Sequence, residues 1–240
     1  MAKNFSTTSK VTNEKWDLVG ALVVERRPVI IKELTEIEKT FTDLLQQIEF
    51  EKSLKSDHEG DIDNIDLDGV NQQTAQDFKD MCKEELAKFN LAPRITESDK
   101  KNDLKSLDRC LDSHLLLLVE HKLGGTYNWI VPQSLHQEGE GLHETALRAL
   151  EENCGGDLKV KLLGRVPWGF YKYKYPRDLR EKGPVGAKVF FFKANYLSGQ
   201  VKLAPKINKD FKWLESSKIF DVKPDAYSDS VSQFLLSCRR

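Results

Sequence analysis

Four glutamates surround one arginine in the second half of the sequence. Glu140, Glu144, Glu151 and Glu152 lie close together along the chain, with Arg148 among them. Carboxylates that converge in space are the ligands that a hard cation such as Mg²⁺ needs, and a cation held in this way assists hydrolysis at phosphorus. The apolar spacing around these acids predicts a helix over 142–153. The chemistry available therefore depends on how many carboxylates share one face of that helix.

The segment that contains these acids resembles the Nudix box, a hydrolase signature written G-x5-E-x7-R-E-U-x-E-E-x-G-U, where U is a bulky apolar residue. It runs from Trp129 to Gly155 as WIVPQSLHQEGEGLHETALRALEENCG. Aligned without a gap, it keeps five positions of the signature: Glu140, Arg148, Leu150, Glu152 and Gly155. It departs at Ser134, which stands where the first glycine belongs, and at Ala149 and Asn153, which stand where two glutamates belong. The predicted order of strand, loop and helix agrees with the resemblance.

The two lost glutamates would carry the metal in a Nudix hydrolase. Positions 149, 152 and 153 are related by i, i+3 and i+4 spacing, so acids at all three would point to one ion. Ala149 and Asn153 leave Glu152 as the only acid on this face. We therefore expect no catalytic residue, no metal site and no cofactor, and a Nudix-like fold that remains as a vestige.

Other interpretations of the same residues stay open. Glu144 and Arg148 form an i, i+4 pair of the kind found on many solvated helices. A Mg²⁺-dependent hydrolase of nucleoside diphosphate derivatives would need Glu140, Glu151 and Glu152 as ligands in an unusual geometry. A module that binds a nucleotide without hydrolysing it is a further alternative.

The elements around this segment predict an α/β (α+β) fold, a Nudix-like mixed sheet sandwiched by helices. Strands are expected near 114–120, 128–131, 159–163, 168–175 and 187–194, with a closing helix over 227–238. The N-terminal part predicts a strand within 16–31, a helix that begins with the capping box Thr35 and Glu38, and a second helix over 74–90. We expect a flexible or presequence-derived terminus over 1–15, a strand and helical arm over 16–105 with an acidic linker at 56–72, and the Nudix-like domain over 106–240.

A basic and aromatic segment lies near the middle of that domain. Residues 159–188 include nine Lys or Arg and only two acids, interleaved with tyrosines. This pattern is compatible with contact to RNA or to a protein partner, and the residues to test are Lys172, Lys174, Arg177, Arg180 and Lys182. An ordinary strand, with aromatic side chains on one face and lysines on the other, explains the alternation equally well.

Composition excludes several classes of protein. The chain has 37 basic and 38 acidic residues, so it has no overall field that would attract nucleic acid. Its most apolar stretches, 18–24 and 115–119, are far shorter than the roughly 20 residues of a membrane-spanning helix. The four cysteines are scattered without a CxxC pair, which argues against a zinc site and favours a reducing compartment.

Three further stretches resemble a single family. They are WDLVGALVVERRPVI from Trp16, APRITESDKKNDLKSLDR from Ala92 and VGAKVFFFKA from Val185. Together with the Nudix-like half, they are similar to the mitochondrial large-ribosomal-subunit protein family numbered forty-six. This resemblance implies a non-catalytic constituent of the large subunit in the mitochondrial matrix, sited in the central protuberance. It also implies that other large-subunit proteins hold it in place, with limited rRNA contact and no membrane.

Overall fold

The structure, a computed structural model, describes residues 15–54, 75–123, 125–181, 183–203, 208–222 and 224–235. The chain divides into two compact units, one formed by Met1–Ile31 with Ile95–Arg240 and the other by Lys32–Arg94. Residues 1–14, the acidic linker predicted at 56–72 and Lys182 lie outside the described residues. In this division the first strand is grouped with the C-terminal half, with which it pairs, whereas the sequence grouped it with the helical arm over 16–105.

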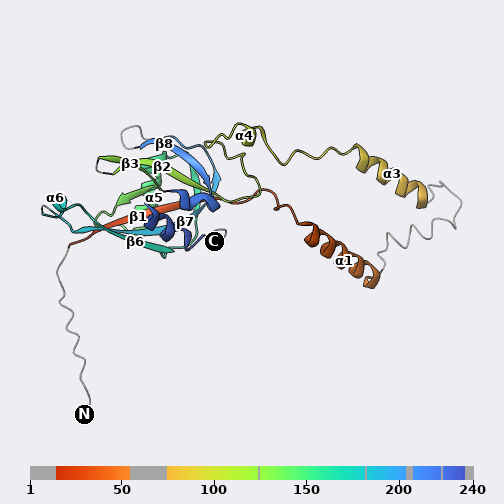
Figure 1. The fold of residues 1–240 in the computed structure, drawn as a ribbon, viewed down its shortest axis with the longest axis horizontal. Helices are drawn as coiled ribbons and strands as arrows, with labels where there is room; N and C mark the ends of the chain where they lie inside the picture. Colours follow the sequence, from red (N-terminus) through yellow and green to blue (C-terminus); the bar gives the residue numbers. More distant parts are fainter. Residues whose placement is uncertain are drawn as a thin grey trace, which may run out of the picture. The chain divides into compact units, whose positions relative to one another are not determined.

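The larger unit is built on one mixed sheet of eight strands within the described residues (Figure 1). The strands are β1 (Asp17–Arg26), β2 (Leu115–Leu123), β3 (Thr126–Ile130), β4 (Gln133–Leu135), β5 (Lys159–Leu162), β6 (Gly169–Lys174), β7 (Gly186–Ser198) and β8 (Asn208–Glu215). Their main order is β3-β2-β1-β7-β5, while β4 pairs with β1, β6 with β7 and β8 with β2. β1 and β7 run parallel, and the other pairs are antiparallel. The mixed sheet is therefore confirmed.

β1 lies at the centre of the sheet. Its sequence, DLVGALVVER, is almost continuously apolar, as expected of a strand covered on both faces. Every residue from Val19 to Arg26 is buried. Its register with β7 extends from the pair Asp17 and Ala187 to the pair Glu25 and Asn195. β1 thus belongs to the folded unit, and the helical arm begins after it.

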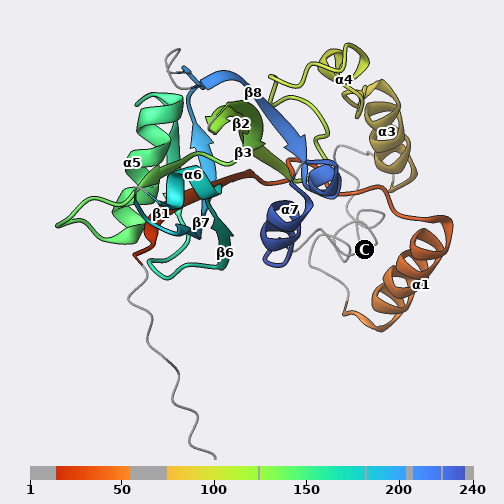
Figure 2. The same cartoon turned by 60° about the vertical axis from the view of Figure 1, so that its left-hand side comes forward.

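Helices cover both faces of the sheet (Figure 2). Gly20 is the point at which α5 (Leu142–Cys154) approaches β1, because a Cβ at Gly20 would lie 2.9 Å from the backbone nitrogen of Ala146. Gly20 is beside Phe190 in register, so α5 lies on the face to which Phe190 points. α7 (Asp225–Ser232) places Tyr227 against Phe191, which points the opposite way. The predicted sandwich of helices is confirmed.

Short helical segments complete the larger unit: α4 (Glu97–Lys100), α6 (Arg177–Arg180) and a 3-10 helix (Ser216–Asp221). The core lies between the sheet and its helices, where the five residues from Leu115 to Val119 are fully buried. At the end of β1, the buried Glu25 carboxylate lies 2.8 Å from Lys193 Nζ and 2.7 Å from His114 Nδ1. These two contacts link the end of β1 to the middle of β7 and to the residue before β2.

The smaller unit contains α1 (Glu36–Lys52) and α3 (Ala75–Lys88). The capping box predicted at Thr35 and Glu38 is present: Glu38 accepts a hydrogen bond from the Thr35 backbone N–H at 2.7 Å. α1 buries no residue, and its large apolar side chains are exposed: Ile37, Phe41, Leu44, Leu45 and Ile48. In the part of the chain that the structure describes, no helix is long and apolar enough to cross a membrane.

Candidate functional site

The residues of the Nudix-like motif lie together at the edge of the larger unit. Ser134 is on β4, Glu140 is in the loop that follows, and Arg148 and Glu152 are on α5. Pairing of β4 with β1 and packing of α5 on β1 hold the two sides of the motif against the same strand. The sheet therefore sets the geometry of this site.

Arg148 binds both remaining acids of the motif. Its Nε and Nη2 donate to the two carboxylate oxygens of Glu140 at 3.1 and 2.7 Å, and its Nη1 donates to Glu152 Oε1 at 2.6 Å. Nη2 also donates to the carbonyl oxygen of Leu135 at 2.7 Å. Ser134 donates its hydroxyl hydrogen to the other oxygen of Glu152 at 2.5 Å. The oxygens that a metal would need are already hydrogen-bonded within the protein.

The electrostatics of this cluster favour the ionised carboxylates. The hydrogen bonds from Arg148 lower the pKa of Glu140 to about 2, with help from the backbone N–H of Gln137. Burial opposes ionisation of Glu152, but hydrogen bonds from Ser134 and Arg148 outweigh it and lower its pKa. The same contacts raise the pKa of Arg148. One guanidinium therefore faces two carboxylates, and this leaves at most one net negative charge for a divalent cation.

The two positions that lost glutamate are both buried. Ala149 is fully buried and Asn153 is 2% exposed, whereas the side chain of Glu152 is 41% exposed at the edge of the site. Asn153 Nδ2 donates to the carbonyl of Ala149 at 2.6 Å, and its Oδ1 accepts from Asn208 at 2.8 Å. Asn208 Oδ1 lies 2.9 Å from Nδ1 of His121. A hydrogen-bonded network, with the two asparagines buried, thus joins α5, β8 and β2 where the motif would place a metal ligand.

The sequence did not reveal this network, because Asn208 lies 55 residues from Asn153 along the chain and neither Asn208 nor His121 belongs to a recognisable pattern. The structure brings together Glu140, Arg148 and Glu152, the three charged residues that the motif alignment singled out. The expected pair of Glu144 with Arg148 is absent, since Glu144 instead accepts a hydrogen bond from the backbone N–H of Gly141 at 2.7 Å. Among the described residues, no group of three or more His, Cys, Asp or Glu side chains could hold a metal ion.

The other two conserved positions of the signature have structural roles here. Leu150 is 2% exposed and belongs to the hydrophobic core. Gly155 ends α5 with a φ of +80°, a conformation that a residue with a Cβ adopts at a cost. Its N–H donates to the carbonyl of Glu151 at 3.0 Å. These two positions maintain the packing and the end of the helix.

Two adjoining hollows lie beside the motif, with volumes of about 300 and 430 Å³. They share Leu123, Gln133 and Tyr173, and tyrosines form much of their walls. None of the described residues that line either hollow is Lys or Arg. A bound diphosphate would therefore meet no cationic side chain there, and Glu152 would repel it.

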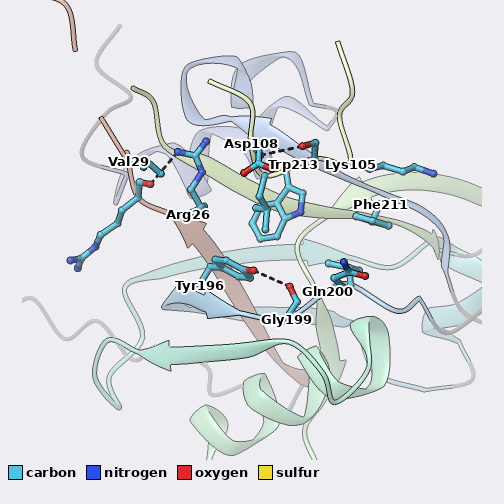
Figure 3. A pocket seen from close by; sticks show the side chains of 13 residues that line it. Arg26, Val29, Lys105, Asp108, Tyr196, Gly199, Gln200, Phe211 and Trp213 are labelled. Carbon is cyan, nitrogen blue, oxygen red and sulfur yellow. Dashed lines mark hydrogen bonds between the residues drawn. The ribbon is translucent and has the colours of Figure 1, made fainter. Parts of the chain in front are cut away.

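A larger hollow, of about 1000 Å³, lies elsewhere in the same unit (Figure 3). Tyr196 and Trp213 lie in its wall, and the hydroxyl of Tyr196 donates to the carbonyl of Gly199 at 2.9 Å. Two of its cationic side chains already bind other groups of the protein. Arg26 donates to backbone carbonyls of the segment before β2, and Lys105 lies 2.8 Å from Asp210. These contacts give Arg26 and Lys105 roles in holding loops.

Within the basic segment, β6 has two different faces. Tyr171 and Tyr173 point toward α7, and Tyr171 packs edge-on against Tyr227 at 5.4 Å. Lys172 and Lys174 alternate with the tyrosines and are exposed on the other face. The predicted alternation is therefore confirmed. Of the other residues to test, Arg177 and Arg180 lie in α6, and Lys182 is outside the described residues.

Comparison with known proteins gives relatives along most of the chain. A family model described as "39S mitochondrial ribosomal protein L46" matches residues 16–99. A Bos taurus protein named "Large ribosomal subunit protein mL46" is 38% identical over 92% of this chain and 84% of its own length. The protein of that name from Rattus norvegicus is 39% identical with the same coverage. A third, from Neurospora crassa, is 36% identical over 58% of this chain and 40% of its own length.

Solved structures give a weaker likeness, over about half of the chain. A MutT protein from Methanosarcina mazei is 18% identical, covers 50% of this chain and 82% of its own, and has a TM-score of 0.39. A Nudix hydrolase from Nitrosomonas europaea is 16% identical, covers 50% of this chain and 79% of its own, and has a TM-score of 0.38. TM-scores this low do not support a conclusion about function. The relatives in sequence therefore decide the family.

Proposed function

Since this chain belongs to the family of mitochondrial ribosomal protein L46, we propose that it is a non-catalytic structural constituent of the large subunit of the mitochondrial ribosome. Its localisation is mitochondrial, and we propose the matrix as the compartment. The site within the subunit is the central protuberance, as the family resemblance implies. The protein needs no cofactor or metal in this role.

The arrangement around Arg148 carries the proposal that the protein is not an enzyme. Hydrolysis at a diphosphate needs a metal held by several free oxygens, together with a path for the substrate to reach it. Here the guanidinium of Arg148 binds Glu140 and Glu152, while the buried Asn153 replaces the third acid. Glu151 is exposed and does not complete a metal-binding group with the other described residues.

The exposed apolar side chains of α1 are the reason to propose neighbouring proteins as the main partners. Along α1, Phe41 and Leu45 are 59% and 50% exposed, and no residue of this helix is buried. A helix with an apolar stripe gains most of its stability from packing that stripe against another surface. The net charge of −1 also argues against a protein whose main role is to coat rRNA. We propose that large-subunit proteins cover this stripe and that rRNA contact is limited.

Sedimentation of the tagged chain tests the assembly role. We expect the chain to migrate with the mitochondrial large subunit through a high-salt gradient, because apolar contacts resist salt. The double variant Phe41→Asp with Leu45→Asp should shift into the free pool. The matched control, Thr42→Asp with Gln46→Asp, adds the same charge beside the stripe and should stay with the subunit. Release of the unaltered chain under mild salt would contradict a constitutive role.

An assay with Mg²⁺ and a panel of nucleoside diphosphate derivatives tests the absence of catalysis. We expect no turnover above that of a heat-denatured sample. Turnover that Glu152→Gln abolishes would establish a hydrolase and refute this part of the proposal. Saturable binding of a nucleotide without turnover would instead establish a binding module.

A further inference from the structure

We propose that one exposed face of β6 and β7 is a contact surface for single-stranded RNA, an inference that rests on the ribosomal role proposed above. We call it the lysine–aromatic face and define it by Trp16, Phe170, Lys172, Lys174 and Lys188. It differs from the set suggested by sequence, because Lys188 and Trp16 join it and α6 is not needed.

The pairing of β6 with β7 brings the lysines together. Lys172 and Lys188 are direct cross-strand partners in the antiparallel register, so their side chains project from the same face. Lys174 follows Lys172 on that face, at about 7 Å along the strand. None of these three lysines forms an ion pair with a carboxylate of the described residues. The result is a compact group of three uncompensated positive charges.

Like charges placed directly opposite each other destabilise a sheet. Among the described residues, the ring of Trp16 offsets part of this repulsion, since Lys172 Nζ lies 4.2 Å and Lys188 Nζ 5.7 Å from its centroid. A strand needs only polar side chains on a solvated face, and serine or threonine would meet that need without repulsion. A local cost of this kind is expected where the charges serve a binding role.

The aromatic side chains favour RNA over a general polyanion. Phe170 is 49% exposed and lies next to Lys172 along β6, and its ring centroid is 5.4 Å from that of Phe190. Aromatic and basic side chains on an open sheet allow a single strand to stack its bases while its phosphates meet cations. Duplex RNA keeps its bases stacked on each other and cannot use Phe170. The surface therefore fits an unpaired RNA segment.

Binding of a labelled single-stranded uridine oligomer to the full chain tests the proposal. Each phosphate neutralised on a single strand contributes about −0.7 to the slope of log K against log salt concentration. The triple variant Lys172→Gln, Lys174→Gln, Lys188→Gln should therefore reduce the slope by about 2 and weaken binding on the order of 100-fold near 0.1 M salt. Arginine at the same three positions should preserve binding.

The control removes three exposed lysines elsewhere, by Lys39→Gln, Lys52→Gln and Lys101→Gln, and should leave affinity within a few-fold. Thermal unfolding should show all variants folded, since the substituted side chains are exposed or, at Lys188, half-buried on the solvated face of β7. Equal binding by the triple variant and the unaltered chain overturns the proposal, as does an equal loss in the control. Stronger binding to polyglutamate than to the oligomer also overturns it, in favour of an acidic protein partner.

Ultraviolet crosslinking within purified large subunits separates this inference from the ribosomal role. We expect uridine adducts on peptides that contain Trp16 or Phe170. If the chain sediments with the subunit but these peptides carry no adduct, the RNA surface is refuted and the ribosomal role stands. If the chain is absent from the subunit, the ribosomal role fails, and the oligomer titration alone decides whether the face binds RNA.

Discussion

Replacing Asn153 by glutamate would return one acid to the Nudix-like motif, and we expect it to destabilise the protein strongly without creating a metal site. Asn153 is 2% exposed, and its amide donates to the carbonyl of Ala149. A carboxylate cannot donate that hydrogen bond and would bring an uncompensated charge into the core. The new side chain would therefore bind a proton in the folded state, so its pKa would rise above 7.

The magnitude follows from the cost of keeping this carboxyl group protonated. At pH 7, when its unfolded pKa is about 4.3, that cost is about 3.7 kcal/mol. The protonated carboxyl group has one O–H, which can take over the hydrogen bond to the carbonyl of Ala149, so the loss of the amide adds little. The free energy of unfolding should therefore fall by about 4 kcal/mol at pH 7, which is a large part of the stability of a typical domain. Because the folded pKa is raised, the proton-dependent part should shrink by about 2.7 kcal/mol at pH 5.

Urea unfolding at pH 5 and pH 7, followed by tryptophan fluorescence, measures this effect. Asn153→Gln is the matched control, because it has the same length as glutamate but keeps the amide and has no proton to bind. The difference between the two variants should be large at pH 7 and small at pH 5, and Mg²⁺ should change neither midpoint. Equal stability of the variants at pH 7, or stabilisation of Asn153→Glu by Mg²⁺, would show that the position is open to solvent and would refute the reasoning.

Three further predictions concern other parts of the larger unit. Gly20→Ala should lower the free energy of unfolding by about 2 kcal/mol in a thermal melt, because its Cβ would press on the backbone at Ala146; an unchanged melting temperature would contradict the close approach. Glu140 has a pKa of about 2 against an ordinary value of 4.5, so its contribution to stability is present above pH 4.5 and lost as the pH falls toward 2. Glu140→Gln should flatten that part of the acid unfolding curve, and an unchanged curve would refute the role of this carboxylate. Burial raises the pKa of Cys154 to about 12, so iodoacetamide at pH 8 should alkylate the exposed Cys82 but leave Cys154 intact, as mass spectrometry would show; rapid alkylation of Cys154 would show that the core opens easily.

The sequence predicted those elements whose signals are local. The apolar spacing predicted α5, and the alternation of tyrosine and lysine predicted β6. The capping box at Thr35 predicted the start of α1. β8 was not predicted, because its sequence NKDFKWLE is highly charged and only pairing with β2 makes it a strand. That pairing also brings Asn208 to Asn153. Interactions of this kind depend on tertiary contacts, and a single sequence contains no local pattern for them.

The same limit applies to the partners of Arg148. Sequence spacing favoured Glu144, one turn away on the same helix, but the folded loop brings in Glu140 and leaves Glu144 to cap the start of α5. A loop whose path depends on β4 cannot be read from helical periodicity.

The parallel pairing of β1 with β7 sets the order in which this protein can fold. A chain that emerges or is imported with its N-terminus first delivers the strand DLVGALVVER long before Ala187, the first residue of β7 to which it pairs. The helical arm is inserted between them, so closing the sheet means closing a very long loop, which makes folding slow. Until β7 arrives, an apolar strand with free backbone donors and acceptors is available for pairing with other chains. The interval before β7 arrives is therefore when the protein is most prone to aggregate, and a chaperone would have its greatest effect during that interval.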